Sequence, residues 1–161
     1  MGKMVLLVLF PAMMFFTACN SHHVNTYSNP KPLFEYSTGS LDFLYIDGSV
    51  KTSITIEIAD TPETQMKGLM GRRDLGPNHG MLFVFKQVKT RKFWMKNTPV
   101  SLDIIFVGED GCIVNIAEST TPMSYKGYWS NEPIKYVVEV RAGFSKQFKI
   151  ETGTCIRWRR S

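Results

Sequence analysis

Alternation of apolar and polar residues dominates the chain from Leu41 onward and predicts strands. Ile54, Ile56 and Ile58 alternate with polar neighbours, so one face of that segment is expected to be buried and the other solvated. Turn signals such as Asp47-Gly48 separate similar segments along the chain. Together these patterns predict seven or eight short strands within 41–46, 53–58, 81–85, 91–95, 102–107, 112–117, 136–140 and 154–158.

The hydrophobic period changes after residue 59, where a helix is expected. Residues 60–63 (DTPE) combine a capping side chain, a proline in the first turn and an early acid. Met66, Leu69 and Met70 then form the expected buried stripe of one helix near 62–71. Short strands with one such helix predict a mainly β (α+β) domain, either a compact β-barrel or a sandwich.

The first eighteen residues have a different character from the rest. Lys3 gives a positive start, residues 4–16 are almost wholly apolar, and small residues follow. The apolar run is shorter than the ~18 residues of a transmembrane helix. The pattern is typical of a secretory signal peptide over 1–18.

The end of this segment, Phe16-Thr17-Ala18-Cys19, resembles the lipobox of bacterial lipoproteins. The resemblance implies that the signal is cut before Cys19 and that its thiol carries a diacylglycerol. We therefore expect an extracytoplasmic protein that is lipid-anchored to a bacterial membrane and faces the periplasm or the cell surface. Residues 19–40 are rich in Asn, Ser, Pro and Thr and are expected to form a flexible tether to a single domain at 41–161.

Four sequence blocks within that domain resemble one protein family. The blocks are 68–72 (GLMGR), 80–85 (GMLFVF), 93–99 (FWMKNTP) and 102–106 (LDIIF). In this order and spacing they are similar to the bacterial and archaeal family catalogued as domain of unknown function 192, over about residues 50–158. The resemblance implies a β-rich fold that often follows a signal peptide, and it implies no established biochemical activity.

Charge and composition exclude several classes of function. Nineteen Lys and Arg face fourteen Asp and Glu in 161 residues, a net charge of +5 that is too dispersed to indicate nucleic-acid binding without a motif. His79 is the only histidine in the expected domain, so neither a zinc site nor another metal site is predicted, and no cofactor motif is present. Five cations and no acid occur within 86–96, which in a membrane-tethered protein favours anionic lipid or a cell-wall component as partner. A solvated turn is the alternative.

A groove near Trp94 is the leading site hypothesis. Strand alternation directs Phe93 and Met95 to one side and Trp94 and Lys96 to the other. With Asn97 they would offer a ring, a cation and an amide to a small ligand or glycan, with Arg72 as a further ligand-binding candidate. The chain would then be a binding or scaffolding module for an envelope component. For most apolar residues of this region, plain core packing is the alternative.

Four charged residues interrupt apolar stretches, namely Arg72, Asp103, Glu118 and Glu139. A buried charge requires a partner, so an Arg72–Asp103 ion pair is one interpretation. In the other, Asp103 or Glu118 is a general acid or base and Arg72 holds an anionic group of the substrate. This second hypothesis describes an enzyme acting on an envelope polymer or an anionic metabolite. The spacing does not select between them.

Two cysteines remain once Cys19 is assigned to the lipid anchor. Cys112 follows a turn and Cys155 opens the last expected strand. The family is not expected to have cysteine at either position, and an even number outside the cytoplasm favours a disulfide. Two reduced, buried thiols are the alternative.

Overall fold

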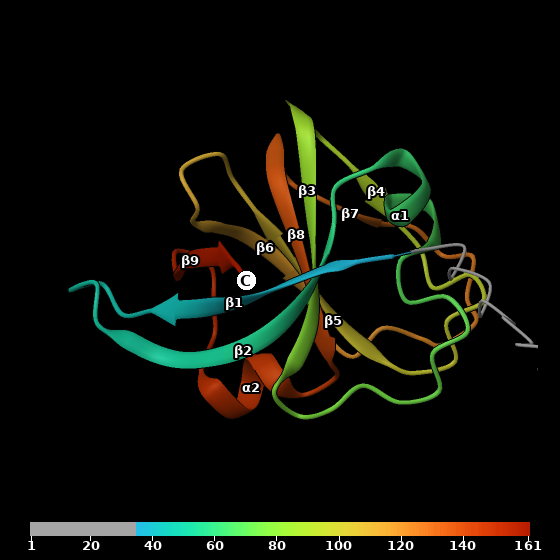
Figure 1. Ribbon diagram of the computed structural model, residues 1–161, viewed down its shortest axis with the longest axis horizontal. Coiled ribbons are helices and arrows are strands. Elements are labelled where there is room, and N and C mark those ends of the chain that lie inside the picture. Colours follow the sequence, from blue (N-terminus) through green and yellow to red (C-terminus); the bar gives the residue numbers. More distant parts are fainter. Residues whose placement is uncertain (1–34) are drawn as a thin grey trace, which may run out of the picture. The chain divides into compact units, whose positions relative to one another are not determined.

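The computed structural model describes residues 35–161. Its elements are β1 (Ser37–Leu44), β2 (Val50–Ala59), α1 (Pro62–Lys67), β3 (His79–Lys89), β4 (Lys92–Phe93), β5 (Leu102–Val107), β6 (Ile113–Ala117), β7 (Tyr128–Trp129), β8 (Ile134–Arg141), α2 (Phe144–Phe148) and β9 (Cys155–Arg160) (Figure 1). Within this part of the chain, neither helix is long and apolar enough to cross a membrane. The expected signal peptide, Cys19 and most of the expected tether lie outside the described residues. The first strand begins at Ser37, earlier than the domain boundary expected at Leu41.

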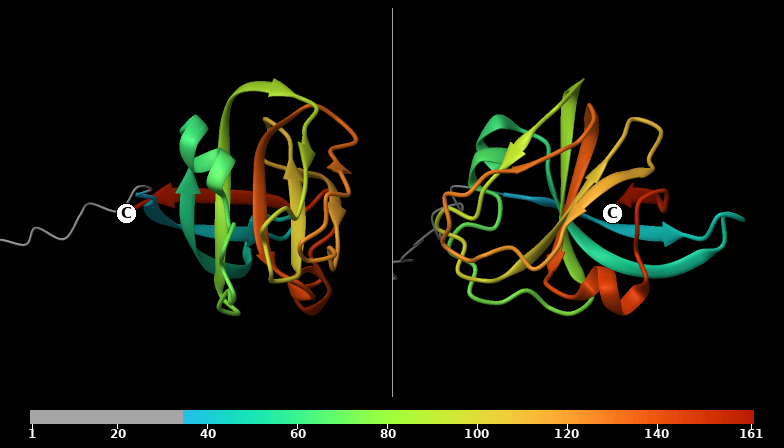
Figure 2. Two further views of the ribbon diagram at one scale, coloured as in Figure 1. Left: turned by 90° about the vertical axis from the view of Figure 1, so that its right-hand side faces the viewer. Right: turned by 180° about the vertical axis from the view of Figure 1, so that it is seen from behind.

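Seven strands form one mixed sheet in the order β6-β5-β8-β3-β2-β1-β9. Its pairs are antiparallel except β2–β3, which run parallel and are connected through α1. The sheet curls until its edge strands β6 and β9 approach at one end, where Ile156 N–H donates to the Gly111 carbonyl at 2.7 Å (Figure 2). No continuous ladder joins these two strands, because their pairing is limited to one isolated bridge between Cys112 and Cys155. The predicted mainly β fold is confirmed, as a sandwich-like sheet that does not close into a barrel.

A disulfide between Cys112 and Cys155 links the two edges at this bridge. The two residues are separated by 43 positions in sequence, and their Cα atoms lie 3.9 Å apart. Of the two alternatives for these cysteines, the structure therefore contains the bridge. It ties the last strand to the turn that precedes β6.

The two faces of the sheet carry separate apolar clusters. The alternating Ile54, Ile56 and Ile58 point into the first cluster, which every strand of the large sheet supplies and α2 completes through Phe144. Because all seven strands contribute, this cluster fills the inside of the curl. The second cluster lies on the opposite face of β3, β5 and β8 and is covered by the small β4–β7 ribbon and by the segment after α1.

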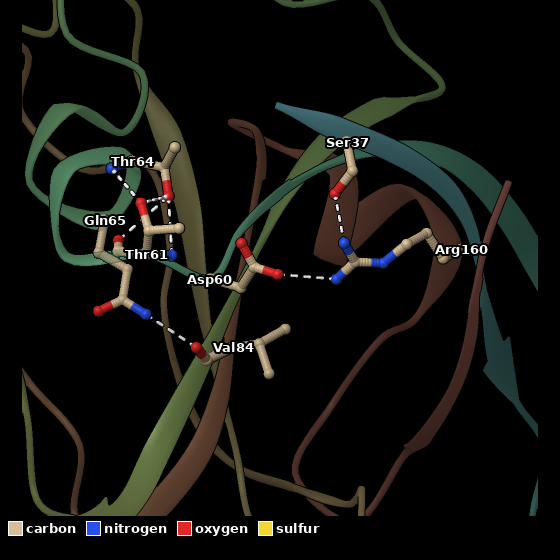
Figure 3. A network of polar contacts seen from close by, with 7 residues as sticks. All are labelled: Ser37, Asp60, Thr61, Thr64, Gln65, Val84 and Arg160. Carbon is tan, nitrogen blue, oxygen red and sulfur yellow. Dashed lines mark hydrogen bonds and ion pairs between the residues drawn. The ribbon is translucent and has the colours of Figure 1, made fainter. Parts of the chain in front are cut away.

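Helix α1 begins where the sequence predicts, at a reciprocal cap. The Thr64 N–H donates to Thr61 Oγ1 at 3.2 Å, and the Thr61 N–H donates to Thr64 Oγ1 at 3.0 Å (Figure 3). The next residue, Gln65, donates from Nε2 to the carbonyl of Val84 at 2.8 Å and fixes the helix against β3. The helix ends at Gly68, which has a φ of +44°, so it is shorter than expected.

The expected buried stripe of this helix is partly wrong. Leu69 is buried in the second cluster, but the side chain of Met66 is 77% exposed. Early termination of the helix explains the difference, because Leu69 lies in the turn that follows and no longer shares a helical face with Met66.

The expected strand at 91–95 is wrong in length. Only Lys92 and Phe93 pair in β4, opposite Trp129 and Tyr128 of β7. The chain then turns, with Asn97 in the left-handed region at a φ of +55°. The partner strand β7 was not predicted, because a two-residue strand carries no readable period.

Candidate functional site

A cavity of about 710 Å³ lies beside the second apolar cluster, between α1, β3 and β4. We call it the aromatic cavity. Figure 1 shows α1 and β4 flanking one end of β3. Three parts of the chain line the aromatic cavity. They are the α1 segment (Gln65, Met66, Lys67, Gly68, Leu69, Met70), the β3–β4 hairpin with the turn after it (Phe83, Phe85, Lys89, Thr90, Arg91, Lys92, Phe93, Trp94, Lys96, Asn97, Thr98), and Glu139 of β8.

Three phenylalanines build a packed wall of the cavity. Phe83 and Phe85 are two residues apart on β3, so strand geometry directs both rings to the same face. Phe93 stands edge-on to both, with ring centroids 5.1 Å from Phe83 and 6.3 Å from Phe85. It also meets Phe106 of β5 edge-on at 6.0 Å. These edge-on ring contacts hold the aromatic wall in place.

Cations dominate the charge around the cavity. Lys67, Lys89, Arg91, Lys92 and Lys96 line it, against Glu139 as the single acid in the lining. Arg91 lies over the ring of Phe85, with its guanidinium carbon 3.5 Å from the centroid. Its Nη2 donates to the carbonyl of Gln87 at 2.8 Å, whereas its buried Nε has no partner among the described residues. Burial lowers the pKa of Arg91.

Glu139 is the unusual residue of this site. In the sheet register it lies between Met81 of β3 and Ile104 of β5, a position otherwise filled by apolar side chains. Its side chain is buried, and burial raises the pKa of the carboxyl to about 8. The group is therefore largely protonated at neutral pH. It adds a hydrogen-bond donor to the cavity lining and little negative charge.

The structure gathers most of the predicted groove. Trp94, Lys96 and Asn97 all line the aromatic cavity. Trp94 is 48% exposed at its rim, and the Lys96 amine lies 6.0 Å from the Trp94 ring centroid. Met95 is fully buried in the second apolar cluster.

Arg72 lies at a different place, so the predicted Arg72–Asp103 ion pair is wrong. Its guanidinium pairs with Glu57 of β2, and this hydrogen bond raises the pKa of Arg72. Both residues line a second cavity of about 430 Å³ together with His79. Arg72 therefore does not share the aromatic cavity with Trp94.

The two candidate acid–base residues lie outside both cavities. Asp103 is fully buried on β5, where its carboxylate accepts backbone N–H groups of Ser119 at 2.9 Å, Gly143 at 3.3 Å and Ser145 at 2.9 Å. The bonds from Gly143 and Ser145 hold the start of α2, and the bond from Ser119 holds the loop after β6. Glu118 is exposed and contributes to neither cavity. The structure thus does not bring Arg72, Asp103 and Glu118 together.

Glu139 and the aromatic wall were not identified from the sequence as parts of the site. Glu139 had been noted as a charge within an apolar run, and its place inside an alternating strand was the available signal. Its neighbours in the cavity come from α1, β3 and β4, and only the fold brings these segments together.

Comparisons with known proteins agree with this fold. The family model DUF192, described as "Uncharacterized ACR, COG1430", matches residues 43–158. A crystal structure from Sinorhizobium meliloti 1021, of a protein for which a role as transcription regulator has been suggested, is 34% identical, with a TM-score of 0.74 over 78% of this chain and 96% of that chain. A protein of unknown function from Novosphingobium aromaticivorans DSM 12444 is 31% identical, with a TM-score of 0.71 over 80% and 90% of the two chains. No curated protein matches the sequence.

Proposed function

This chain belongs to the DUF192 family, and we propose that it is a binding protein for small amphipathic anions, which it holds in the aromatic cavity. One observation carries the proposal, namely that a packed aromatic wall and several cations converge on one cavity whose only acid is buried and largely protonated. A volume of about 710 Å³ is typical of small-molecule sites.

The chemistry of the lining defines the class of ligand. The partly exposed ring of Phe93, which packs against the buried Phe83, offers apolar surface to a flat or chain-like body. Lys92 and Lys96, near the exposed Trp94, offer ammonium groups to an anionic head. Because the carboxyl of Glu139 is largely uncharged at neutral pH, it does not repel such an anion. A carboxylate, sulfonate or phosphate on an apolar body fits these requirements.

We propose further that the protein is an extracytoplasmic lipoprotein anchored through Cys19, with an envelope component as its natural ligand. The pattern of residues 1–18 and the resemblance of residues 16–19 to a lipobox support this. The Cys112–Cys155 disulfide adds independent support, because such bonds persist mainly outside the reducing cytoplasm.

The alternative of an enzyme with Asp103 or Glu118 as acid or base has weaker support. The Asp103 carboxylate is already engaged by three backbone N–H groups, and Glu118 lines neither cavity. A general acid must reach the reacting group of a bound substrate. Neither residue is placed to reach a ligand in the aromatic cavity.

Fluorescent probes test the binding proposal directly. The anionic probe 1-anilinonaphthalene-8-sulfonate and its uncharged analogue N-phenyl-1-naphthylamine share an aromatic body and differ in the anionic group. We expect the full chain to bind both. Charge reversal at Lys92→Glu and Lys96→Glu should weaken the sulfonate at least about tenfold and leave the neutral analogue nearly unchanged.

A matched control separates the cavity from general charge effects. Lys146 is exposed on α2, and the substitution Lys146→Glu changes the same kind of charge outside the cavity lining. It should leave both probes unaffected. Equal loss of sulfonate binding in this control, or unchanged sulfonate binding after reversal of Lys92 and Lys96, would show that the rim cations do not hold the anion.

A further inference from the structure

We propose that the outward face of the β4–β7 ribbon docks onto an anionic lipid surface. This aromatic–lysine face consists of three exposed rings and two lysines, namely Trp94, Tyr125, Trp129, Lys92 and Lys96. The inference goes beyond ligand binding in the cavity. It does not depend on the cavity being occupied.

Strand geometry places these side chains on one side of the ribbon. Lys92 pairs opposite Trp129, and Phe93 pairs opposite Tyr128. Phe93 and Tyr128 pack on the second apolar cluster, so alternation turns Lys92 and Trp129 outward. The Lys92 amine lies 5.5 Å from the ring centroid of Trp129. The next outward residue along the chain is Trp94.

The segment that precedes β7 extends this face beside Trp94. Met95 N–H donates to the Ser124 carbonyl at 3.0 Å, so the two segments run side by side. The Lys96 amine lies 6.0 Å from the Trp94 ring centroid and 5.9 Å from that of Tyr125. Lys96 therefore bridges the two aromatic residues, and the face is continuous.

The three aromatic side chains of this face are more exposed than is usual for large apolar residues. Trp94 is 48% exposed, Tyr125 68% and Trp129 57%. A cluster of exposed apolar groups on a folded domain marks an interaction surface. Tryptophan and tyrosine are the residues enriched where proteins meet the membrane–water interface.

Charge complementarity identifies the partner as an anionic surface. The segments that build the face, 86–102 and 119–131, contain six lysines and arginines and no aspartate or glutamate. Glu118 and Glu132 come immediately outside the second segment. Cations next to interfacial aromatic rings fit anionic lipid head groups, which attract each nearby lysine. Trp94, Lys92 and Lys96 also line the aromatic cavity, so docking would place the cavity rim at the lipid surface.

Quenching by brominated lipids tests this contact on the full chain. Bromine in the acyl chains quenches a tryptophan only when the indole reaches the bilayer. Of the tryptophans, Trp94 and Trp129 lie on the face, whereas Trp158 of β9 packs against Tyr136, with ring centroids 6.4 Å apart. We expect vesicles with brominated phosphatidylglycerol to quench the parent, and the variant with Trp94→Phe and Trp129→Phe to lose most of that quenching.

Charge variants test the lipid specificity. Neutralising Lys92 and Lys96 to Gln should lower the docking equilibrium about fivefold for each lysine, and brominated phosphatidylcholine alone should quench much less. The matched control carries Lys146→Gln and Lys149→Gln, two exposed positions that are not part of the face, and should behave like the parent.

Three results would overturn the proposal. They are equal quenching with anionic and neutral vesicles, undiminished quenching after the lysines of the face are neutralised, and undiminished quenching when only Trp158 remains. Binding of a soluble acidic polymer, together with no quenching by the brominated vesicles, would indicate a polyanion in place of lipid. Because the measurement uses no cavity probe, its failure would leave the probe-binding result intact, and the reverse also holds.

Discussion

Replacing Glu139 by glutamine should stabilise the protein above neutral pH. The carboxyl lies in the row between Met81 and Ile104, and burial raises its pKa from the ordinary 4.5 to about 8. Glutamine has nearly the same size and carries no charge at any of these pH values. The substitution Glu139→Gln therefore removes the titration and keeps the packing.

The sign and size of the effect follow from the two pKa values. Between about pH 4.5 and 8 the folded protein binds more protons at this site than the unfolded chain, so its stability falls as the pH rises. The contribution of Glu139 to the free energy of unfolding is fully present below about pH 4.5 and is lost as the pH rises through about 8. At about 1.36 kcal/mol per unit, the difference between the two pKa values amounts to about 5 kcal/mol.

Urea unfolding of the full chain at intervals from pH 5 to pH 9 measures this difference. We expect the free energy of unfolding of the parent to decline with pH relative to Glu139→Gln, with the largest gap above pH 8. The substitution Glu118→Gln is the matched control, since this side chain is exposed, and it should track the parent. Parallel pH profiles of the parent and Glu139→Gln would refute a raised pKa at this position.

Three further predictions concern the edges of the sheet and the anchor. Replacing Cys112 and Cys155 by serine opens a loop that spans 43 positions and should lower the free energy of unfolding, measured in urea, by about 4 kcal/mol. The same loss in the parent after reduction of its disulfide would support this, and no loss in the variant would contradict it. The substitution Gly39→Ala would put a Cβ 2.3 Å from the carbonyl oxygen of Arg159 and should cost about 1–3 kcal/mol, with faster amide exchange along β9; unchanged exchange would argue against this close approach. The substitution Cys19→Ser should abolish partitioning of the protein into detergent, and partitioning equal to that of the parent would exclude the lipid anchor.

The sequence predicted those parts of the fold that depend on interactions between residues close together in the chain. The alternating Ile54, Ile56 and Ile58 became one buried face of β2, and the cap at Thr61 opened α1. Pairings across the sheet were not readable in the same way. Arg72 meets Glu57 because the turn after α1 brings it beside β2, and no spacing in the sequence records that approach.

In the candidate site, too, the residues that are close in sequence were predicted and those that only the fold brings together were not. Trp94, Lys96 and Asn97 are neighbours in sequence, and the structure keeps them together at the cavity. Glu139 follows Trp94 by more than forty residues and joins it only through the order of strands in the sheet. The role of Asp103 was equally hidden, because its three partners are backbone groups that carry no side-chain signature.

A crystal structure with an aryl sulfonate that carries bromine tests the central claim most directly, because anomalous scattering locates the halogen without ambiguity. With 4-bromobenzenesulfonate, the account predicts one bromine peak in the aromatic cavity beside Phe93 and a sulfonate within hydrogen-bond distance of Lys92 or Lys96. Bromine in the second cavity beside Arg72, or no ordered bromine in the aromatic cavity at saturating concentration, would contradict it.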